Sequence, residues 1–467
     1  MYGILSGFEI GKRGLLSQQF ALNVTGHNIA NVNTPGFSRQ RAVLRTTTPY
    51  NTIQGSLGTG VDVAGVERYR DLFFDTQYRQ ESQNLGQWSS LHRGLRSLEG
   101  TVFVDEPSDN GLNALMSNFW NAWQNLTNDP ESATNREDVR SKSSVLIDAF
   151  HQKYKFLKDL EQSTNDEITQ KMVEVNSLAI QIANLNQQVS YAELSGGKAN
   201  DLRDRRDLLI DQLSEIVDVN VVERNTGAVT VYVGAMALVE RDTVNSLDTE
   251  KEYADGVMKS TVVWKGTSSV VRFNNGELAG LCKFRDEVIP EYVDALNQMA
   301  ETLVTQVNTV HRQGYALDGT TTGIDFFDPN GVTAQDIALS SDISDISNGV
   351  NNIAAASSGG ARGDSSNALA IAQLRNSLLM NGNSATIGDF YSSMIGVLGS
   401  RTKETEDIKD SQELLLTQIE NNRQSVEGVS LDEEMANMIR FQHAYEAAAR
   451  VISTMDEIMT TLIDSVK

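Results

Sequence analysis

Cysteine, proline and histidine are all scarce in this 467-residue sequence, which has one cysteine, six prolines and five histidines. The lone cysteine, Cys282, excludes an intrachain disulfide and a thiolate-rich metal site, so we interpret it as a small core residue. No nucleophile elbow, phosphate-binding loop or dinucleotide fingerprint occurs. The histidines lie far apart in the sequence and in no metal-ligand spacing: His27, His92, His151, His311 and His443. We therefore expect no catalytic residue, no metal ion and no cofactor.

Basic residues and long apolar runs are also lacking. Lysine and arginine number 39 against 62 aspartate and glutamate, which gives a formal net charge of -23. A field of that sign repels nucleic acid and anionic lipid. No stretch approaches the roughly twenty apolar residues of a membrane span, and the first residues lack the basic and apolar regions of a cleavable signal peptide. We expect no nucleic-acid partner, no membrane insertion and no cleavable signal.

The C-terminal region carries a heptad pattern of apolar side chains. Such a repeat is typical of a helix that packs along a narrow coiled-coil contact. Ser430 and Glu433 form a Ser-x-x-Glu capping box, which predicts that this helix begins near residue 430. The positions seven apart are Leu431, Met438, Tyr445, Ile452, Met459 and Val466, and the set three residues further on is Phe441, Ala448, Met455 and Leu462.

The N-terminal region carries a matching stripe on a helix expected from about residue 4 to residue 30. Its apolar positions seven apart are Phe8, Leu15, Leu22 and Ile29. Each glycine within a helix costs about 1 kcal/mol relative to alanine, so we interpret the glycines here as points of close backbone approach. These glycines are Gly3, Gly7, Gly11, Gly14 and Gly26. Because a lone terminal helix gains its order mainly from packing, we predict that both termini fold on assembly.

The order of elements is symmetrical about a β-rich centre. β-branched runs at 219–223, 229–233 and 257–264 predict strands, whereas the flanking sequence is mainly helical. We therefore predict a multidomain α+β fold whose chain runs out and back, with both termini at one pole of a rod and the β-rich domain at the other. Its parts are a helical coiled-coil terminal layer (1–50 plus 428–467), a helical-bundle middle domain (51–199 plus 356–427) and a β-rich outer domain (200–355) with a long helix near 281–313.

Two charged motifs have simple structural interpretations. We interpret the run from Asp201 to Asp207 as a solvated helix face with Asp201–Arg205 and Arg203–Asp207 pairs. Arg362-Gly363-Asp364 matches an adhesion tripeptide, but three residues carry little specificity.

Several segments resemble one family of bacterial proteins. The stretch Asn28-Ile29-Ala30-Asn31-Val32-Asn33-Thr34-Pro35-Gly36-Phe37-Ser38-Arg39-Gln40 resembles the N-terminal signature of flagellar rod, hook and hook-associated proteins. Its Pro-Gly-aromatic-Ser-Arg-Gln ending is similar to the hook-associated protein 1 family, although many relatives have Tyr where this chain has Phe37. Residues 428–437 and 441–450 are similar to the closing helix of that family, and the resemblance extends through 202–209 and 284–290.

The resemblance implies a structural protein that is exported unfolded through the flagellar type III channel and forms a homo-oligomeric ring outside the cell, at the hook-filament junction. It implies contacts with the hook protein and with a second junction protein. It also implies an export chaperone on the C-terminal helix, near Met438, Phe441, Tyr445 and Ile452.

We expect the assembly interface to be formed by both ends of the chain. The expected residues are Phe8, Leu15, Leu22, Ile29, Asn31, Thr34, Pro35, Gly36 and Phe37, together with Leu431, Met438, Phe441, Tyr445, Ala448, Ile452, Met455, Met459 and Leu462.

Three other interpretations stay open. The nearest is a hook or rod protein of the same axial class. A surface adhesin would use Arg362 to Asp364, and a wall-degrading enzyme would need a site that no paired carboxylates or histidine cluster nominates. We favour the non-enzymatic structural protein.

Overall fold

The computed structural model describes residues 2–466 apart from 53, 54, 105, 107, 195, 225, 255 and 256. Its helices are α1 (Tyr2–Ala30), α2 (Leu72–Val102), α3 (Leu112–Leu126), α4 (Ala133–Glu193), α5 (Asn200–Ile216), α6 (Glu277–Lys283), α7 (Ile289–His311), α8 (Ser341–Ser344), α9 (Ser366–Gln373), α10 (Ile387–Glu427) and α11 (Leu431–Val466). A π-helical segment, Phe284–Val288, joins α6 to α7, and short 3₁₀ helices lie at Gly349–Asn352 and Leu374–Asn376.

The strands form small antiparallel sheets. They are β1 (Gln40–Thr46), β2 (Tyr50–Thr52), β3 (Gly55–Leu57), β4 (Val61–Arg68), β5 (Val219–Glu223), β6 (Val229–Val233), β7 (Met236–Glu240), β8 (Thr243–Val244), β9 (Leu247–Ala254), β10 (Val257–Trp264) and β11 (Ser269–Val270). The sheet orders are β1-β4, β2-β3, β5-β6-β7-β8 and β11-β10-β9. The three strands predicted from β-branched runs are confirmed as β5, β6 and β10.

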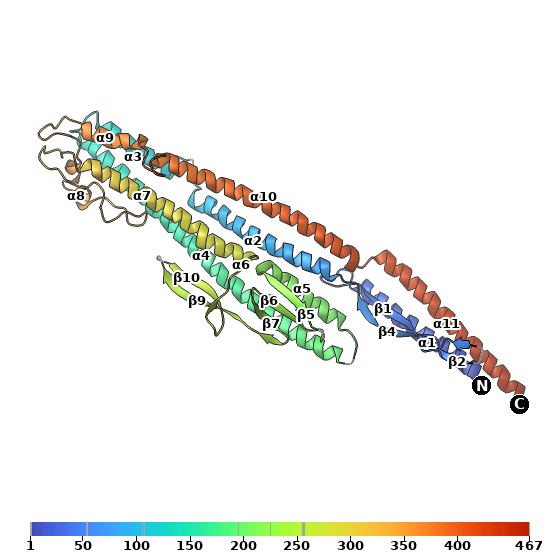
Figure 1. The fold of residues 1–467 in the computed structure, drawn as a ribbon. Helices are drawn as coiled ribbons and strands as arrows, with labels where there is room; N and C mark the ends of the chain where they lie inside the picture. Colours follow the sequence, from blue (N-terminus) through green and yellow to red (C-terminus); the bar gives the residue numbers. More distant parts are fainter. Residues whose placement is uncertain are drawn as a thin grey trace.

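The molecule is elongated, and its chain runs out and back (Figure 1). α1 and α11 lie side by side at one end with both termini, and α2 and α10 continue from them into the helical body. The multidomain α+β fold and the out-and-back path are therefore confirmed. The prediction that the β-rich part occupies the far pole is wrong. β5 to β10 lie along the side of α4 and α5, and loops with α8 and α9 form that pole (Figure 1).

Two hydrophobic cores follow the length of α4. Its first half packs with α2, α3, α7 and the start of α10, in a core that includes Phe119, Trp123 and Phe150. Its second half packs with α5, α6 and the strands β5 to β10. The long helix near 281–313, which we grouped with the β-rich stretch, therefore contributes α7 to the helical core instead. Its apolar positions, such as Leu296 and Leu303, face α-helical neighbours.

Cys282 lies at the edge of the second core, as expected of a small packing residue. Burial raises the pKa of its thiol to about 11, so the thiol is protonated and unreactive at neutral pH.

Candidate assembly helices and the elbow that carries them

The terminal helices α1 and α11 pack closely because α1 presents glycine to its partner. A Cβ atom placed on Gly11 would lie 2.9 Å from Cγ1 of Ile452, and one placed on Gly14 would lie 3.6 Å from Cβ of Ala448. A Cβ atom on Gly7 would lie 2.7 Å from the terminal carbon of Met455. The interpretation as points of close approach is confirmed for Gly7 and Gly11, whereas the contact at Gly14 has an ordinary van der Waals distance. Nothing lies within 4 Å of such an atom on Gly26, and the surroundings of Gly3 lie outside the described side chains.

The predicted apolar stripe of α1 flanks this glycine face. Phe8, Leu15, Leu22 and Ile29 are all half-buried. Among the side chains of α1 that the structure describes, from residue 6 onward, the buried positions are Gly11, Ser17, Ala21, Thr25 and Asn28. The face of α1 that the fold buries most deeply is therefore made of small residues. We expected the apolar stripe on that face, because large apolar side chains usually mark the contact of a coiled-coil helix.

The predicted stripe of α11 divides between paired and exposed positions. Ala448, Ile452 and Met455 lie against α1. Leu431 and Leu462 are exposed, and the side chain of Val466 lies outside the described part of the chain. The remaining predicted residues are half-buried: Met438, Phe441, Tyr445 and Met459.

Large apolar side chains remain exposed on both terminal helices. On α11 these include Met435 at 50% and Ile439 at 56% exposure, and on α1 they include Leu16 at 53%. Two packed helices can bury only the faces that meet, so the other apolar positions face solvent in a single chain. We call the following set the outer apolar residues: Ile10, Leu16 and Phe20 of α1, and Leu431, Met435 and Ile439 of α11.

The turn that follows α1 docks on α5. Gly36 has φ +74° and lies so near Leu208 that a Cβ atom would be 3.1 Å from the Leu208 Cβ atom. Both the left-handed backbone and the close contact require glycine. The N–H and the hydroxyl of Ser38 donate to the two carboxylate oxygens of Asp204, each at 2.9 Å. Two segments that the family resemblance rests on, 28–40 and 202–209, are therefore in direct contact.

The remaining predicted residues of this turn have local roles. The Asn31 amide donates to the carbonyl of His27 at 3.0 Å, and the Thr34 hydroxyl donates to Asn31 Oδ1 at 3.1 Å. Phe37 packs edge-on against the His27 ring, with centroids 5.4 Å apart. Thr34 and Pro35 are exposed.

The charged run from Asp201 to Asp207 is only partly solvated, and its predicted pairs are wrong: Asp201 and Arg205 are exposed, whereas the charged residues at 203, 204, 206 and 207 are buried. Arg203 donates to Glu193 and Glu223, each at 2.6 Å, rather than to Asp207. Asp201 accepts from Gln40 at 2.7 Å rather than from Arg205. The four buried charges point inward because the segments around residues 38–40 and 66–70 cover this side of α5 and supply partners that are far away in sequence.

A buried network of ion pairs links α5 to the segment before α2. Arg68 donates to Asp204 at 2.6 Å and to Asp207 at 3.0 Å, and Arg70 Nη1 lies 3.6 Å from Asp207. Burial alone would raise the pKa of Asp207, but Arg70, Arg206 and Arg68 outweigh burial and hold that pKa well below its usual range. Asp207 is therefore a charged structural group that joins the body to the terminal region. One sequence signal could have suggested this structural role: residues 202–209 are among the segments that resemble the family.

The connection between α10 and α11 is held by Arg39. We call residues 427–430 the elbow; the helical path changes direction there (Figure 1). The Arg39 N–H donates to the carbonyl of Glu427 at 2.8 Å. Its guanidinium donates to Glu433 at 2.7 Å and to Glu434 at 2.8 Å, in the first turn of α11. Arg39 therefore contacts both helices that meet at the elbow.

The predicted capping box is half formed. The Glu433 N–H donates to the Ser430 hydroxyl at 3.4 Å, and α11 begins at Leu431 as predicted. The carboxylate of Glu433 accepts from Arg39 instead of returning to Ser430. Glu434, 2% exposed, accepts from Asn28 of α1 at 3.0 Å. The start of α11 is thus tied to the end of α1 and to the turn beyond it.

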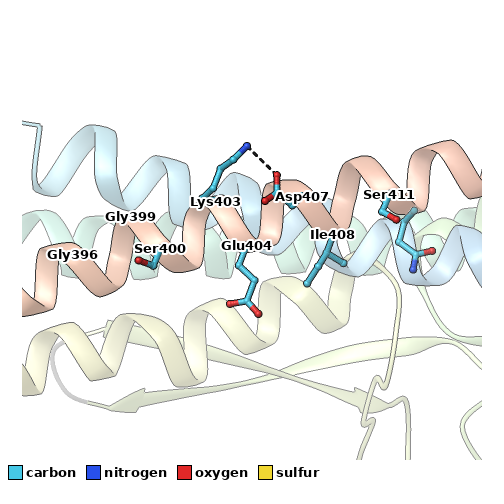
Figure 2. Close-up of a pocket in the computed structure, with 9 residues that line it drawn as sticks. Gly396, Gly399, Ser400, Lys403, Glu404, Asp407, Ile408 and Ser411 are labelled. Atoms are coloured by element: carbon cyan, nitrogen blue, oxygen red, sulfur yellow. Dashed lines mark ion pairs between the residues drawn. The ribbon is translucent and has the colours of Figure 1, made fainter.

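A shallow, open depression lies along α10, and Figure 2 shows the residues that line it. It has a volume of about 920 Å³, and the side chains drawn there come from that one helix, with an ion pair of 3.0 Å between Lys403 and Asp407. Gly396 and Gly399 leave the helix surface low at one end of it.

Across the described residues, no group of three or more His, Cys, Asp and Glu is placed to hold a metal ion. None of the described helices is both long and apolar enough to cross a membrane.

Known proteins match the chain from end to end. Flagellar hook-associated protein 1 of Bacillus subtilis (strain 168) is 32% identical over 506 aligned residues, which cover 99% of this chain and 99% of the relative. The chain belongs to the flagellar hook-associated protein 1 family. Flagellar hook-associated protein 1 of Escherichia coli (strain K12) is 25% identical over 97% of this chain and 98% of the relative. Membership of this family gives the chain a structural role in the flagellar axis.

Family-level matches agree with this assignment. Residues 101–327 match the flagellar hook-associated protein FlgK helical domain. Residues 8–37 match the flagella basal body rod protein family, and residues 422–465 match the flagellar basal body rod FlgEFG protein C-terminal family. The two ends that pair as α1 and α11 therefore both match families of rod proteins.

A solved structure shares the fold. The flagellar hook junction protein FlgK from Burkholderia pseudomallei superposes with a TM-score of 0.64 at 17% identity, over 74% of this chain and 100% of that one. The fold described above is therefore that of the hook-associated protein 1 family.

Proposed function

We propose that this protein forms a homo-oligomeric ring at the junction between hook and filament and that α1 and α11 build its inner layer. The observation that carries the proposal is the set of outer apolar residues, which stays exposed after α1 and α11 have packed together. A neighbouring copy would cover these side chains. Burying a large apolar side chain stabilises a contact by about 1.5–3 kcal/mol, so a few of them per copy suffice for a stable ring.

The remaining parts of the proposal follow from the family. The ring would contact the hook protein on one side and the second junction protein on the other, outside the cell. The exposed positions of α11 would first bind an export chaperone, and the chain would pass through the flagellar export channel unfolded. Its role is entirely structural, without catalysis. The proposed division is an inner terminal layer (1–50 plus 428–467), a middle domain (51–199 plus 356–427) and an outer domain (200–355), with α7 shared with the middle domain.

The adhesin alternative has no support from the side chains of its motif. The carboxylate of Asp364 accepts hydrogen bonds from the N–H and hydroxyl groups of Ser357 and Ser366, at 2.6–2.9 Å. These bonds hold the pKa of Asp364 well below its usual range and fix the loop around it. An integrin-like partner would have to break them to reach the carboxylate.

A matched pair of substitutions tests the proposal. Met435→Glu places a charge among the outer apolar residues, and Ala436→Glu places the same charge on the next exposed position of α11. We expect Met435→Glu to be secreted but to abolish ring formation and filament growth, whereas Ala436→Glu assembles normally. Electron microscopy of cells carrying each variant gives the readout. Normal rings with Met435→Glu would refute the proposed interface.

The segment lost on deletion separates the junction from the nearest alternative. Cells without the gene should build complete hooks that carry no filament and release filament subunits into the medium. Loss of the rod or of the hook itself would identify a rod or hook protein instead.

A further inference from the structure

One carboxyl group of the elbow has no adequate counter-charge. Glu427 is the last residue of α10, and its side chain is only 7% exposed. Its Oε1 atom has no hydrogen-bond partner and lies 4.0 Å from Nε of Arg70. A buried carboxylate without a close partner is unstable, because burial removes its hydration.

The nearest cations are already engaged by other carboxylates. Arg70 donates two hydrogen bonds to Asp75, at 2.7 and 2.9 Å, and lies 3.6 Å from Asp207. Arg423, one turn earlier in α10, donates to Asp211 at 2.8 Å and lies 3.7 Å from Asp75. An ionised Glu427 would therefore be a further negative charge beside cations that are already paired.

These surroundings favour the neutral carboxyl. Burial raises the pKa of Glu427 to about 7, with Arg70 and Arg423 lowering it, Asp75 raising it, and a hydrogen bond from the backbone of Asp71 lowering it. These groups come from each side that faces Glu427: the start of α2, the segment before it and α10 itself.

The backbone of Glu427 is coupled to the terminal helices. Its carbonyl accepts from the Arg39 N–H, and the Arg39 guanidinium holds Glu433 and Glu434 at the start of α11. The Arg39 carbonyl in turn accepts from the Tyr69 N–H at 2.8 Å, next to Arg70. A shift of Glu427 would therefore disturb the contacts that fix α1 and α11 against the body.

We propose that Glu427 is an acid-base latch for the elbow: the closed elbow accommodates its neutral carboxyl, and loss of its proton to water favours an opened elbow in which the carboxylate is hydrated, which loosens the terminal helices from the body. The latch acts within a single chain, and only its effect in an assembled ring rests on the proposed function. In a ring, the latch would make the angle between inner layer and body easier to change above neutral pH.

The direction of the effect follows from linkage. Because the folded pKa is raised above the ordinary value, the closed elbow keeps its full stability below about pH 4.5 and loses it as pH rises through about 7. Each unit of pKa difference corresponds to a tenfold change in the equilibrium. We expect the opening constant of the elbow to rise on the order of 100-fold between about pH 5 and pH 8 and then to level off.

Hydrogen exchange by mass spectrometry on the purified full-length monomer tests the latch. The reporter peptides contain the amides of Arg39, Tyr69 and Gly428, each bonded at 2.8 Å across or beside the elbow. Rates are measured from about pH 5 to pH 8.5 and corrected for intrinsic chemical exchange. Protection of these peptides should fall with rising pH, while protection of α7 peptides should not.

Two glutamine variants complete the test. Glu427→Gln should keep the elbow protected at every pH, whereas Glu413→Gln, at an exposed site on the same helix, should leave the pH dependence intact. The unsubstituted chain decides the matter even if Glu427→Gln does not fold: pH-independent protection at the elbow overturns the proposal. Unchanged pH dependence in a folded Glu427→Gln chain overturns it as well. Because the measurement uses monomer, its failure leaves the ring proposal untouched.

Discussion

The close contact between α1 and α11 makes a sharp prediction for two alanine substitutions in one helix. Alanine is favoured over glycine within a helix by about 1 kcal/mol, so Gly26→Ala, with nothing within 4 Å of the new methyl group, should stabilise α1 by about that amount. At Gly11 the methyl group would lie 2.9 Å from Ile452, and overpacking of this kind costs about 1–3 kcal/mol. Gly11→Ala should therefore be less stable than Gly26→Ala by about 1–3 kcal/mol.

Hydrogen exchange of α1 peptides measures this difference without unfolding the two cores. The predicted gap corresponds to exchange about 5- to 150-fold faster in Gly11→Ala than in Gly26→Ala. Gly7→Ala should be milder than Gly11→Ala, because the atom in its way is the flexible end of Met455.

A double-mutant cycle identifies the contact responsible. Ile452→Ala removes the Cγ1 atom that the new methyl group would meet, so Gly11→Ala should cost less in an Ile452→Ala chain than alone. Equal effects of Gly11→Ala and Gly26→Ala, or strict additivity in the cycle, would refute the packing argument.

Three further substitutions test the network and the outer end of the molecule by urea unfolding or hydrogen exchange. Asp207→Asn should destabilise the chain by about 3–5 kcal/mol, because it leaves buried guanidinium groups unpaired. Its control, Asp201→Asn, changes a side chain that is 54% exposed and should alter stability by less than about 1 kcal/mol. Arg39→Ala should speed exchange in the first turns of α11 by about tenfold or more, and Arg41→Ala, whose pair with Glu67 is exposed, should not. The buried ring of His311 accepts a hydrogen bond from the Ala354 N–H at 2.9 Å, and burial lowers the pKa of this histidine to about 4. The free energy of unfolding should therefore fall by up to about 3 kcal/mol as pH drops from about 6.5 toward 4. His311→Gln should abolish that dependence.

Much of the fold was predictable because it depends on patterns that are local in sequence. Periodicity predicted the terminal helices, β-branched runs predicted β5, β6 and β10, and the capping residue Ser430 predicted the start of α11. Of the α1 glycines, Gly7 and Gly11 were correctly interpreted as close contacts, whereas Gly26 has no neighbour that would explain its cost in a helix.

The remainder depends on tertiary partners that no local pattern specifies. The charges of 203–207 look solvated in a helix considered alone, but residues 38 and 66–70 cover them and supply Arg68 and Arg70. The position of the β strands beside α4 depends on which face of a 61-residue helix they cover. The Glu433 carboxylate accepts a hydrogen bond from Arg39, which lies far away in sequence, and does not complete the capping box that its spacing from Ser430 suggested.

The account rests on the claim that neighbouring copies meet through α1 and α11, and hydrogen exchange in the monomer and in assembled rings tests it most directly. Peptides from residues 6–30 and 431–465, including those with Leu16, Met435 and Ile439, should be only partly protected in the monomer, because α1 and α11 bury only the faces that meet, and should gain protection on assembly, while α2, α4 and α7 change little. Protection that is already complete in the monomer, or that is gained in the helical body and not at the termini, would contradict the account.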